Sequence, residues 1–94
     1  MTTLLFTHSS SLRHVTPEGH PERPDRIRAV NQILGSEHFK ELVRRDAPLG
    51  RDEDILRAHA YEHLERLRAI APVEGFEYVD PDTVMSPGTL EAAL

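Results

Sequence analysis

The stretch Gly19-His-Pro-Glu-Arg-Pro-Asp-Arg-Ile27 marks the passage from a loop into a helix. Pro24 suits the first helical position, because an N–H group there has no intrahelical partner to lose. Apolar residues then follow at helical spacing: Ile27, Val30, Ile33 and Leu34. Gly35 is typical of the residue that ends a helix. The sequence therefore predicts a helix that begins at Pro24 and ends before Gly35.

The segment before this helix predicts one strand and one long loop. Thr3 to Thr7 is a short apolar run with β-forming residues, which indicates a strand. Residues 8–23 contain serine, glycine and proline without a helical or strand period, which predicts an irregular loop. Loops longer than about 12–15 residues are uncommon in compact domains and are usually functional or disordered. We therefore expect residues 8–23 to contribute to a functional site.

The segment after the helix predicts further helices. Ser36 is expected to cap a short second helix, and residues 44–50 to form a strand stub or a loop. Three acidic residues from Asp52 to Asp54 favour a third helix start, because acidic groups stabilise helix N-termini. An apolar stripe then runs to Ala71 and predicts two helices that break near His59. Together these patterns predict an α/β chain with one short strand and three to four helices.

The last quarter of the chain predicts a second long loop and the start of another helix. Residues 72–88 are expected to form the loop, and Thr89 is expected to cap a helix over residues 90–94. A helix of five residues is unstable alone, because isolated helices need about 12–15 residues. We therefore expect residues 1–94 to be the incomplete portion of a single longer domain.

Composition excludes several classes of protein. The 94 residues contain no cysteine, which excludes a disulfide scaffold, a thiolate zinc site and a cysteine nucleophile on this chain. The net charge is −5, which argues against nucleic-acid binding and binding to anionic membranes. No apolar run approaches the roughly 18 residues of a membrane span. We expect a cytoplasmic protein, and the sequence does not specify its oligomeric state.

Arg26 has two interpretations on physical grounds. It falls at about the third helical position, where a cation faces the positive end of the helix dipole and loses a few tenths of a kcal/mol. In the first interpretation, Glu22 or Asp25 neutralises it on a solvated surface. In the second, the guanidinium points inward and holds a carboxylate through a planar, bidentate contact.

The motif His14-x-Thr-Pro-x-Gly-His-Pro-Glu-Arg-Pro-x-Arg-Ile27 resembles the N-terminal signature of the histone deacetylase superfamily. Its bacterial acetoin-utilisation deacetylases and acetylpolyamine amidohydrolases are the most similar branches. Weaker matches follow in the same order at Ile55-Leu-Arg-Ala-His59, at Tyr61 to Leu67 and at Val79-Asp-Pro-Asp-Thr-Val84. The resemblance implies a three-layer α/β/α fold of the arginase/deacetylase type. It implies zinc-dependent hydrolysis of an N-acetyl amide, with acetyl-lysine, an acetylpolyamine or a similar molecule as substrate.

The resemblance also implies roles for two residues. Arg26 matches an arginine that lines an internal channel through which acetate can leave. Asp82 matches a loop aspartate at the rim of the active site that accepts hydrogen bonds from the substrate. From the residues alone, Asp82 could instead form an Asx-type turn after Pro81. Both interpretations of Asp82 remain open at this point.

The metal ligands of the family have no counterpart here. No two of the six histidines are adjacent, and no Asp-x-His occurs, so the chain is expected to bind no zinc by itself. In the longer protein, zinc would act as Lewis acid and water activator. The resemblance therefore implies that these residues supply walls, rim and channel, with no catalytic residue among them.

Two alternatives belong to other classes. His59-Ala-Tyr-Glu-His63 satisfies the inverted zincin pattern, in which His59 and His63 on one helical face would bind zinc and Glu62 would act as base. His8, His14 and His20 recur every six residues, but they are expected to anchor loops through hydrogen bonds instead of converging on a metal. The second alternative to a deacetylase portion is a free-standing helical interaction module without catalysis.

Overall fold

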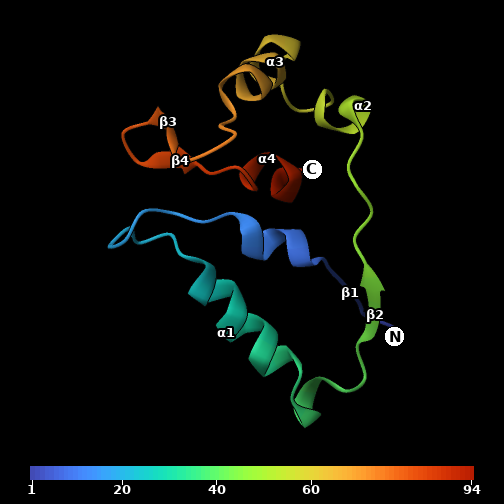
Figure 1. The fold of residues 1–94 in the computed structure, drawn as a ribbon. Coiled ribbons are helices and arrows are strands. Elements are labelled where there is room, and N and C mark those ends of the chain that lie inside the picture. Colours follow the sequence, from blue (N-terminus) through green and yellow to red (C-terminus); the bar gives the residue numbers. More distant parts are fainter.

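A computed structural model describes residues 1–94 as a mixed α/β chain, as the sequence predicts (Figure 1). Two short 3-10 helices, η1 (Ser9–Arg13) and η2 (Glu37–Phe39), accompany the regular elements. The helices and strands, in chain order, are β1 (Leu4–Thr7), α1 (Pro24–Leu34), β2 (Val43–Asp46), α2 (Asp52–Ile55), α3 (Tyr61–Ile70), β3 (Glu77–Asp80), β4 (Thr83–Met85) and α4 (Thr89–Ala93).

β1 and β2 form a parallel pair, in register from Leu4 opposite Val43 to Thr7 opposite Asp46. The predicted strand at residues 3–7 is thereby confirmed, and the strand stub after residue 43 is a true strand. The predicted second helix is wrong beyond η2, because its inward residue Val43 enters β2 instead. There its N–H donates to the Thr3 carbonyl at 3.0 Å, so pairing with β1 decides its conformation.

α1 has the predicted bounds. It begins at Pro24, and Gly35 caps its end by donating its N–H to the carbonyls of Asn31 and Gln32 at 3.1 and 3.2 Å. Gly35 keeps a right-handed φ of −81°, so this end of the helix does not require glycine. The left-handed glycine that matters lies upstream, at Gly19, where φ is +84°.

The predicted break near His59 is confirmed, since α2 ends at Ile55 and α3 begins at Tyr61. A bidentate ion pair joins the two helices: the Arg68 guanidinium donates to both carboxylate oxygens of Asp52, at 2.5 and 2.8 Å. The hydrogen bonds from Arg68 lower the pKa of Asp52.

The predicted loop at residues 72–88 is wrong, because β3 and β4 form an antiparallel hairpin within it. Val84 and Met85 in β4 are only 3% exposed, so the hairpin buries two apolar side chains that a loop would leave in water. The predicted cap at Thr89 is also wrong by one residue. Gly88 is the N-cap of α4, and the Thr89 hydroxyl instead accepts a hydrogen bond from Ser86 N–H at 2.8 Å.

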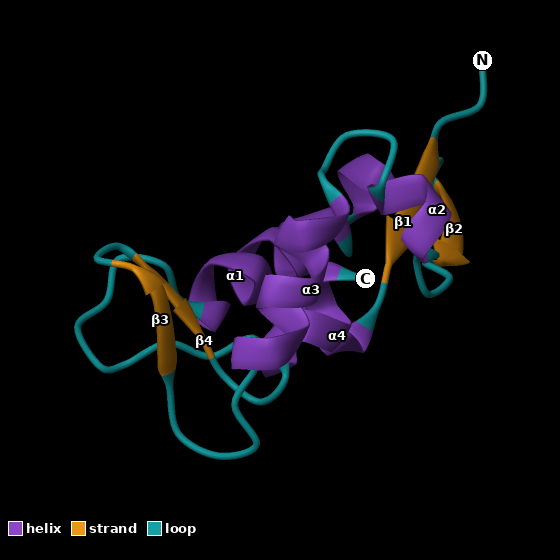
Figure 2. Ribbon diagram, turned by 90° about the horizontal axis from the view of Figure 1, so that it is seen from above, coloured by secondary structure: helices purple, strands orange, loops and turns teal.

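The molecule is flat and open. The radius of gyration is 15.4 Å, whereas a compact chain of this length has a value of about 12 Å. The β1–β2 pair and the β3–β4 hairpin lie at opposite ends, with helices between them (Figures 1 and 2). Only Leu64, Val84 and Met85 form a buried apolar core, while Leu4 and Phe6 of β1 are 52% and 53% exposed. None of the helices combines the length and apolar character needed to cross a membrane.

Candidate functional site

A hollow of about 550 Å³ lies beside the hairpin, and we call it the hairpin hollow. Its polar lining comes from the loop before α1, from α3 and from the β3–β4 turn. The polar residues that matter are His14, His20, Glu22, His63 and Asp82, and the apolar wall includes Leu67, Val84, Met85 and Leu90. The predicted site loop at residues 8–23 and the predicted rim residue Asp82 thus meet at one concave surface.

Asp82 lies in the turn between β3 and β4. The turn is closed by its neighbour, since Asp80 Oδ1 accepts hydrogen bonds from the N–H groups of Asp82 and Thr83, each at 2.8 Å. The hydrogen bond from Asp82 N–H is the largest cause that lowers the pKa of Asp80. The Asx-type turn expected of Asp82 is therefore made by Asp80, and the Asp82 carboxylate is exposed without a hydrogen bond.

His20 connects the loop to that turn. Its Nδ1 accepts the N–H of Glu22 at 3.0 Å, and its Nε2 lies 3.2 Å from the carbonyl oxygen of Asp82. A ring nitrogen that accepts a hydrogen bond has no proton, so the ring proton lies on Nε2, which donates to Asp82. Sequence reasoning placed His20 among the loop anchors, and this role is confirmed. It did not foresee the partner, because the two residues are 62 positions apart.

A group of hydrogen-bonded residues around Ser86 connects η1 to α4, and we call it the Ser86 cluster. Ser86 is fully buried, and its Oγ accepts the N–H of Val15 at 3.0 Å and donates to the Arg13 carbonyl at 3.3 Å. The Thr89 hydroxyl bonds both Ser86 N–H and His14 Nδ1. These bonds join residues 13–15 to residues 86–89, and they place His14 at the edge of the hairpin hollow.

Arg26 is 66% exposed and pairs with Glu22, with Nη2 3.2 Å from Oε1. The neutralisation by Glu22 expected in the first interpretation is therefore present. The Arg26 side chain also borders a neighbouring hollow of about 320 Å³, whose other wall includes Thr89, Ala92 and Ala93 of α4. Its role in an acetate channel stays a prediction.

The residues of the inverted zincin pattern do not share a helical face. His59 precedes α3, and the extended Ala60 separates it from the helix that contains Glu62 and His63. The two imidazole rings stack, with centroids 5.2 Å apart and an interplanar angle of 26°. No group of three or more histidine or carboxylate side chains in the chain is arranged to hold a metal ion. The premise of this alternative, one continuous helix across both histidines, is wrong.

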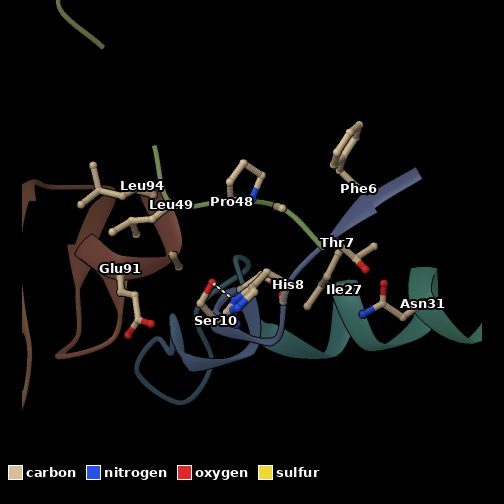
Figure 3. Close-up of a pocket in the computed structure, with 14 residues that line it drawn as sticks. Phe6, Thr7, His8, Ser10, Ile27, Asn31, Pro48, Leu49, Glu91 and Leu94 are labelled. Atoms are coloured by element: carbon tan, nitrogen blue, oxygen red, sulfur yellow. Dashed lines mark hydrogen bonds between the residues drawn. The ribbon is translucent and has the colours of Figure 1, made fainter. Parts of the chain in front are cut away.

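A third hollow, of about 520 Å³, opens where β1 ends (Figure 3). Its lining includes Phe6 and His8 from the end of β1, Asn31 from α1 and Leu49 beyond β2. The His8 ring is held by Ser10, whose N–H donates to Nδ1 at 3.0 Å. Sequence reasoning did not single out Asn31, although a hollow at the carboxyl ends of parallel strands is a usual place for function.

Comparisons with known proteins agree with this fold. No protein-family model matches the chain. A histone deacetylase-like amidohydrolase from Pseudomonas aeruginosa is 36% identical over 76 residues, which cover 80% of this chain and 20% of that protein. An uncharacterized protein from Synechocystis is 33% identical over 86 residues, covering 87% of this chain and 28% of its own length. The chain thus spans only 20% to 28% of the length of these relatives.

A comparison with solved structures finds a similar fold. The crystal structure of the HDA15 HD domain superposes with a TM-score of 0.84 at 21% identity, covering 99% of this chain and 28% of that domain. At this identity the superposition establishes the fold. In sequence the chain is similar to a histone deacetylase-like amidohydrolase, and in fold it is similar to a histone deacetylase domain.

Proposed function

We propose that residues 1–94 are the N-terminal portion of a zinc-dependent deacetylase domain that hydrolyses N-acetyl amides in the cytoplasm. The observation that carries the proposal is the 36% identity to a histone deacetylase-like amidohydrolase over most of the chain. The proposed substrates are acetyl-lysine, an acetylpolyamine or a similar acetylated amine. In this proposal the chain contributes Asp82 at the rim and Arg26 at an internal channel.

The uncovered apolar surface supports an incomplete domain. Parallel sheets in proteins are normally covered on both faces, because their connections place helices there. Here the parallel pair is only two strands wide, and Leu4 and Phe6 of β1 are about half exposed. Further strands and helices of the same domain would cover these side chains. A free-standing helical module fits this chain less well, since a core of three buried apolar residues gives it little stability.

The residues present do not fit zinc. The side chains of His8, His14 and His20 bond separate partners, while His59 and His63 stack on each other. In this proposal the zinc is held by residues outside these 94, and the roles of this chain are binding and orientation. The exposed Asp82 carboxylate can accept hydrogen bonds from a substrate amide. The Arg26 guanidinium can hold an acetate ion through two parallel hydrogen bonds.

The test uses the full-length gene product, assayed on an acetyl-lysine peptide and on an acetylpolyamine. We expect hydrolysis that a chelator abolishes and zinc restores. Asp82→Asn should lower kcat/KM about tenfold to a hundredfold, because it replaces a charged acceptor with a neutral amide oxygen that accepts a weaker hydrogen bond. Glu74→Gln changes an exposed carboxylate outside the three hollows and serves as the control. Failure to hydrolyse either substrate in the presence of zinc would overturn the proposal.

A further inference from the structure

The backbone of Asp82 is held on both sides by side chains. Its N–H donates to Asp80 Oδ1 at 2.8 Å, and its carbonyl accepts from His20 Nε2 at 3.2 Å. The Asp82 carboxylate itself makes no hydrogen bond. The result is a turn whose main chain is fixed while its carboxylate stays free to meet a ligand.

The two side chains that hold the Asp82 backbone belong to different parts of the chain. Asp80 belongs to the hairpin, so its hydrogen bonds shape the turn but do not place it relative to the rest of the site. His20 belongs to the loop before α1, 62 residues earlier in the sequence. The hydrogen bond from His20 is therefore the contact that ties the Asp82 turn to the opposite wall of the hairpin hollow.

The loop that presents His20 is rigid enough to act as an anchor. Gly19, with a φ of +84°, completes a tight turn in which His20 N–H donates to the Pro17 carbonyl at 3.0 Å. Glu22 is held at both backbone groups, since its N–H donates to His20 Nδ1 and its carbonyl accepts from the Thr16 hydroxyl. Prolines at 17 and 21 further restrict the backbone of this segment.

We infer that His20 is a positioning residue that sets where the Asp82 carboxylate stands at the rim of the hairpin hollow. The inference rests on the proposed function, in which Asp82 receives the substrate. His20 itself does not meet the substrate in this arrangement, because both of its ring nitrogens are engaged by the protein. Loss of the His20 contact should therefore weaken substrate binding without removing any reacting group.

Two amide substitutions separate the two hydrogen bonds of His20. His20→Asn keeps an acceptor near Nδ1 for the Glu22 N–H but is too short to reach Asp82. His20→Gln keeps a donor near Nε2 for the Asp82 carbonyl. His20→Ala removes both bonds, and His38→Asn, at an exposed histidine without a hydrogen bond, is the matched control. If His20 only held its own loop through the bond to Glu22, His20→Asn would behave as the parent protein does, and His20→Gln would behave as His20→Ala does.

The first readout is amide hydrogen exchange of residues 80–83 in the full-length gene product. We expect exchange in this turn to speed up roughly two- to tenfold in His20→Ala and His20→Asn, because one hydrogen bond is lost. His20→Gln and His38→Asn should exchange as the parent does. Unchanged exchange in His20→Asn, or faster exchange in His20→Gln alone, would overturn the inference.

The second readout is the kinetics of deacetylation with the same variants. We expect KM to rise roughly two- to tenfold in His20→Asn while kcat stays within about twofold, the pattern of lost uniform binding. His20→Gln should restore KM. A fall in kcat without a change in KM would contradict a positioning role. Should the parent protein show no deacetylase activity, the proposed function fails, and the exchange experiment still decides whether His20 holds the turn.

Discussion

His14 and Thr89 meet across 75 residues of sequence, with the imidazole Nδ1 2.7 Å from the hydroxyl Oγ1. The same hydroxyl accepts the N–H of Ser86 at 2.8 Å. The Thr89 side chain of α4 therefore holds both the loop that contains His14 and the residue that follows β4. The partially buried position of this contact makes it a structural bond of the Ser86 cluster. Its loss should weaken the connection between residues 13–15 and 86–89, which the bonds of Ser86 Oγ to Val15 N–H and to the Arg13 carbonyl also join.

Thr89→Val should destabilise the protein by about 1–3 kcal/mol, because it leaves the Ser86 N–H and the His14 ring without their partner in a part-buried setting. Valine preserves the shape of threonine, so the effect reports the hydroxyl. Thr2→Val, at an exposed terminal residue, is the control. Urea denaturation of the full-length gene product measures the change, and equal midpoints for the two variants would contradict the prediction.

Gly88→Ala should destabilise the protein by about 1–3 kcal/mol through a steric clash. A Cβ at this position would lie 2.7 Å from the Cβ of Arg13, because α4 and η1 approach each other closely there. The matched control is Gly35→Ala, whose Cβ would meet its nearest atom, the Gln32 carbonyl oxygen, at 3.4 Å. Thermal unfolding of both variants tests the difference, which should disappear if Arg13 can move aside at no cost.

Arg26→Met should lower kcat/KM about tenfold or more if the guanidinium holds acetate in an internal channel, because methionine keeps the length of the side chain and removes its donors. Arg28→Met, two residues further along α1, removes a cation that pairs with Asp25 on the surface. Steady-state assays of the two variants on the same acetylated substrate make the comparison. Equal activity of the two variants would show that Arg26 only pairs with Glu22 at the surface.

Asp80→Asn should make the stability of the protein depend less on pH. Hydrogen bonds from Asp82 N–H and Thr83 lower the pKa of Asp80 below its ordinary value of 3.8. A lowered pKa means that the carboxylate stabilises the folded state above that value and that this contribution is lost as the pH falls through the folded-state pKa.

The parent protein should therefore be more stable than Asp80→Asn at pH 5–7, and the gap should narrow below about pH 4. Denaturation midpoints across this range provide the measurement. A gap that stays constant down to about pH 2 would show that the charge of Asp80 adds nothing to the turn.

His59→Ala should leave the amount of zinc bound to the full-length gene product unchanged. His59 stacks on His63 and lies outside the helix that would be needed to bring both rings to one ion. Metal analysis after purification and dialysis decides the matter, with His38→Ala as control. A loss of zinc that is specific to His59→Ala would restore the inverted zincin as a candidate.

The elements that local sequence determines could be predicted, and those that depend on distant partners could not. α1 has a proline start and a helical apolar period, which are both local signals. β2 contains only one apolar residue in Val43-Arg-Arg-Asp46, and it becomes a strand because β1 offers it a parallel partner. The β3–β4 hairpin lacks an Asn-Gly turn and is closed by the Asp80 side chain instead.

The residues of the candidate site also divide into those that could be predicted from the sequence and those that depend on distant partners. The position of Arg26 near a helix N-terminus made it a candidate from the residues alone, whereas the resemblance to the family supplied the proposed roles of both Arg26 and Asp82. The contact between His20 and Asp82 was out of reach, because nothing local links two loop residues so far apart. The inverted zincin pattern would have needed a continuous helix across Ala60, and the predicted break near His59 already argued against one.

The open parallel pair of β1 and β2 has a consequence for producing the protein. Each strand has a neighbour on one side only, so each presents an unpaired backbone edge beside the exposed side chains of Leu4 and Phe6. Such edges are templates for pairing between separate copies, and incompletely folded chains that expose them aggregate. Recombinant expression is therefore best begun from a longer polypeptide, in which neighbouring segments can cover the strands before two newly made copies meet.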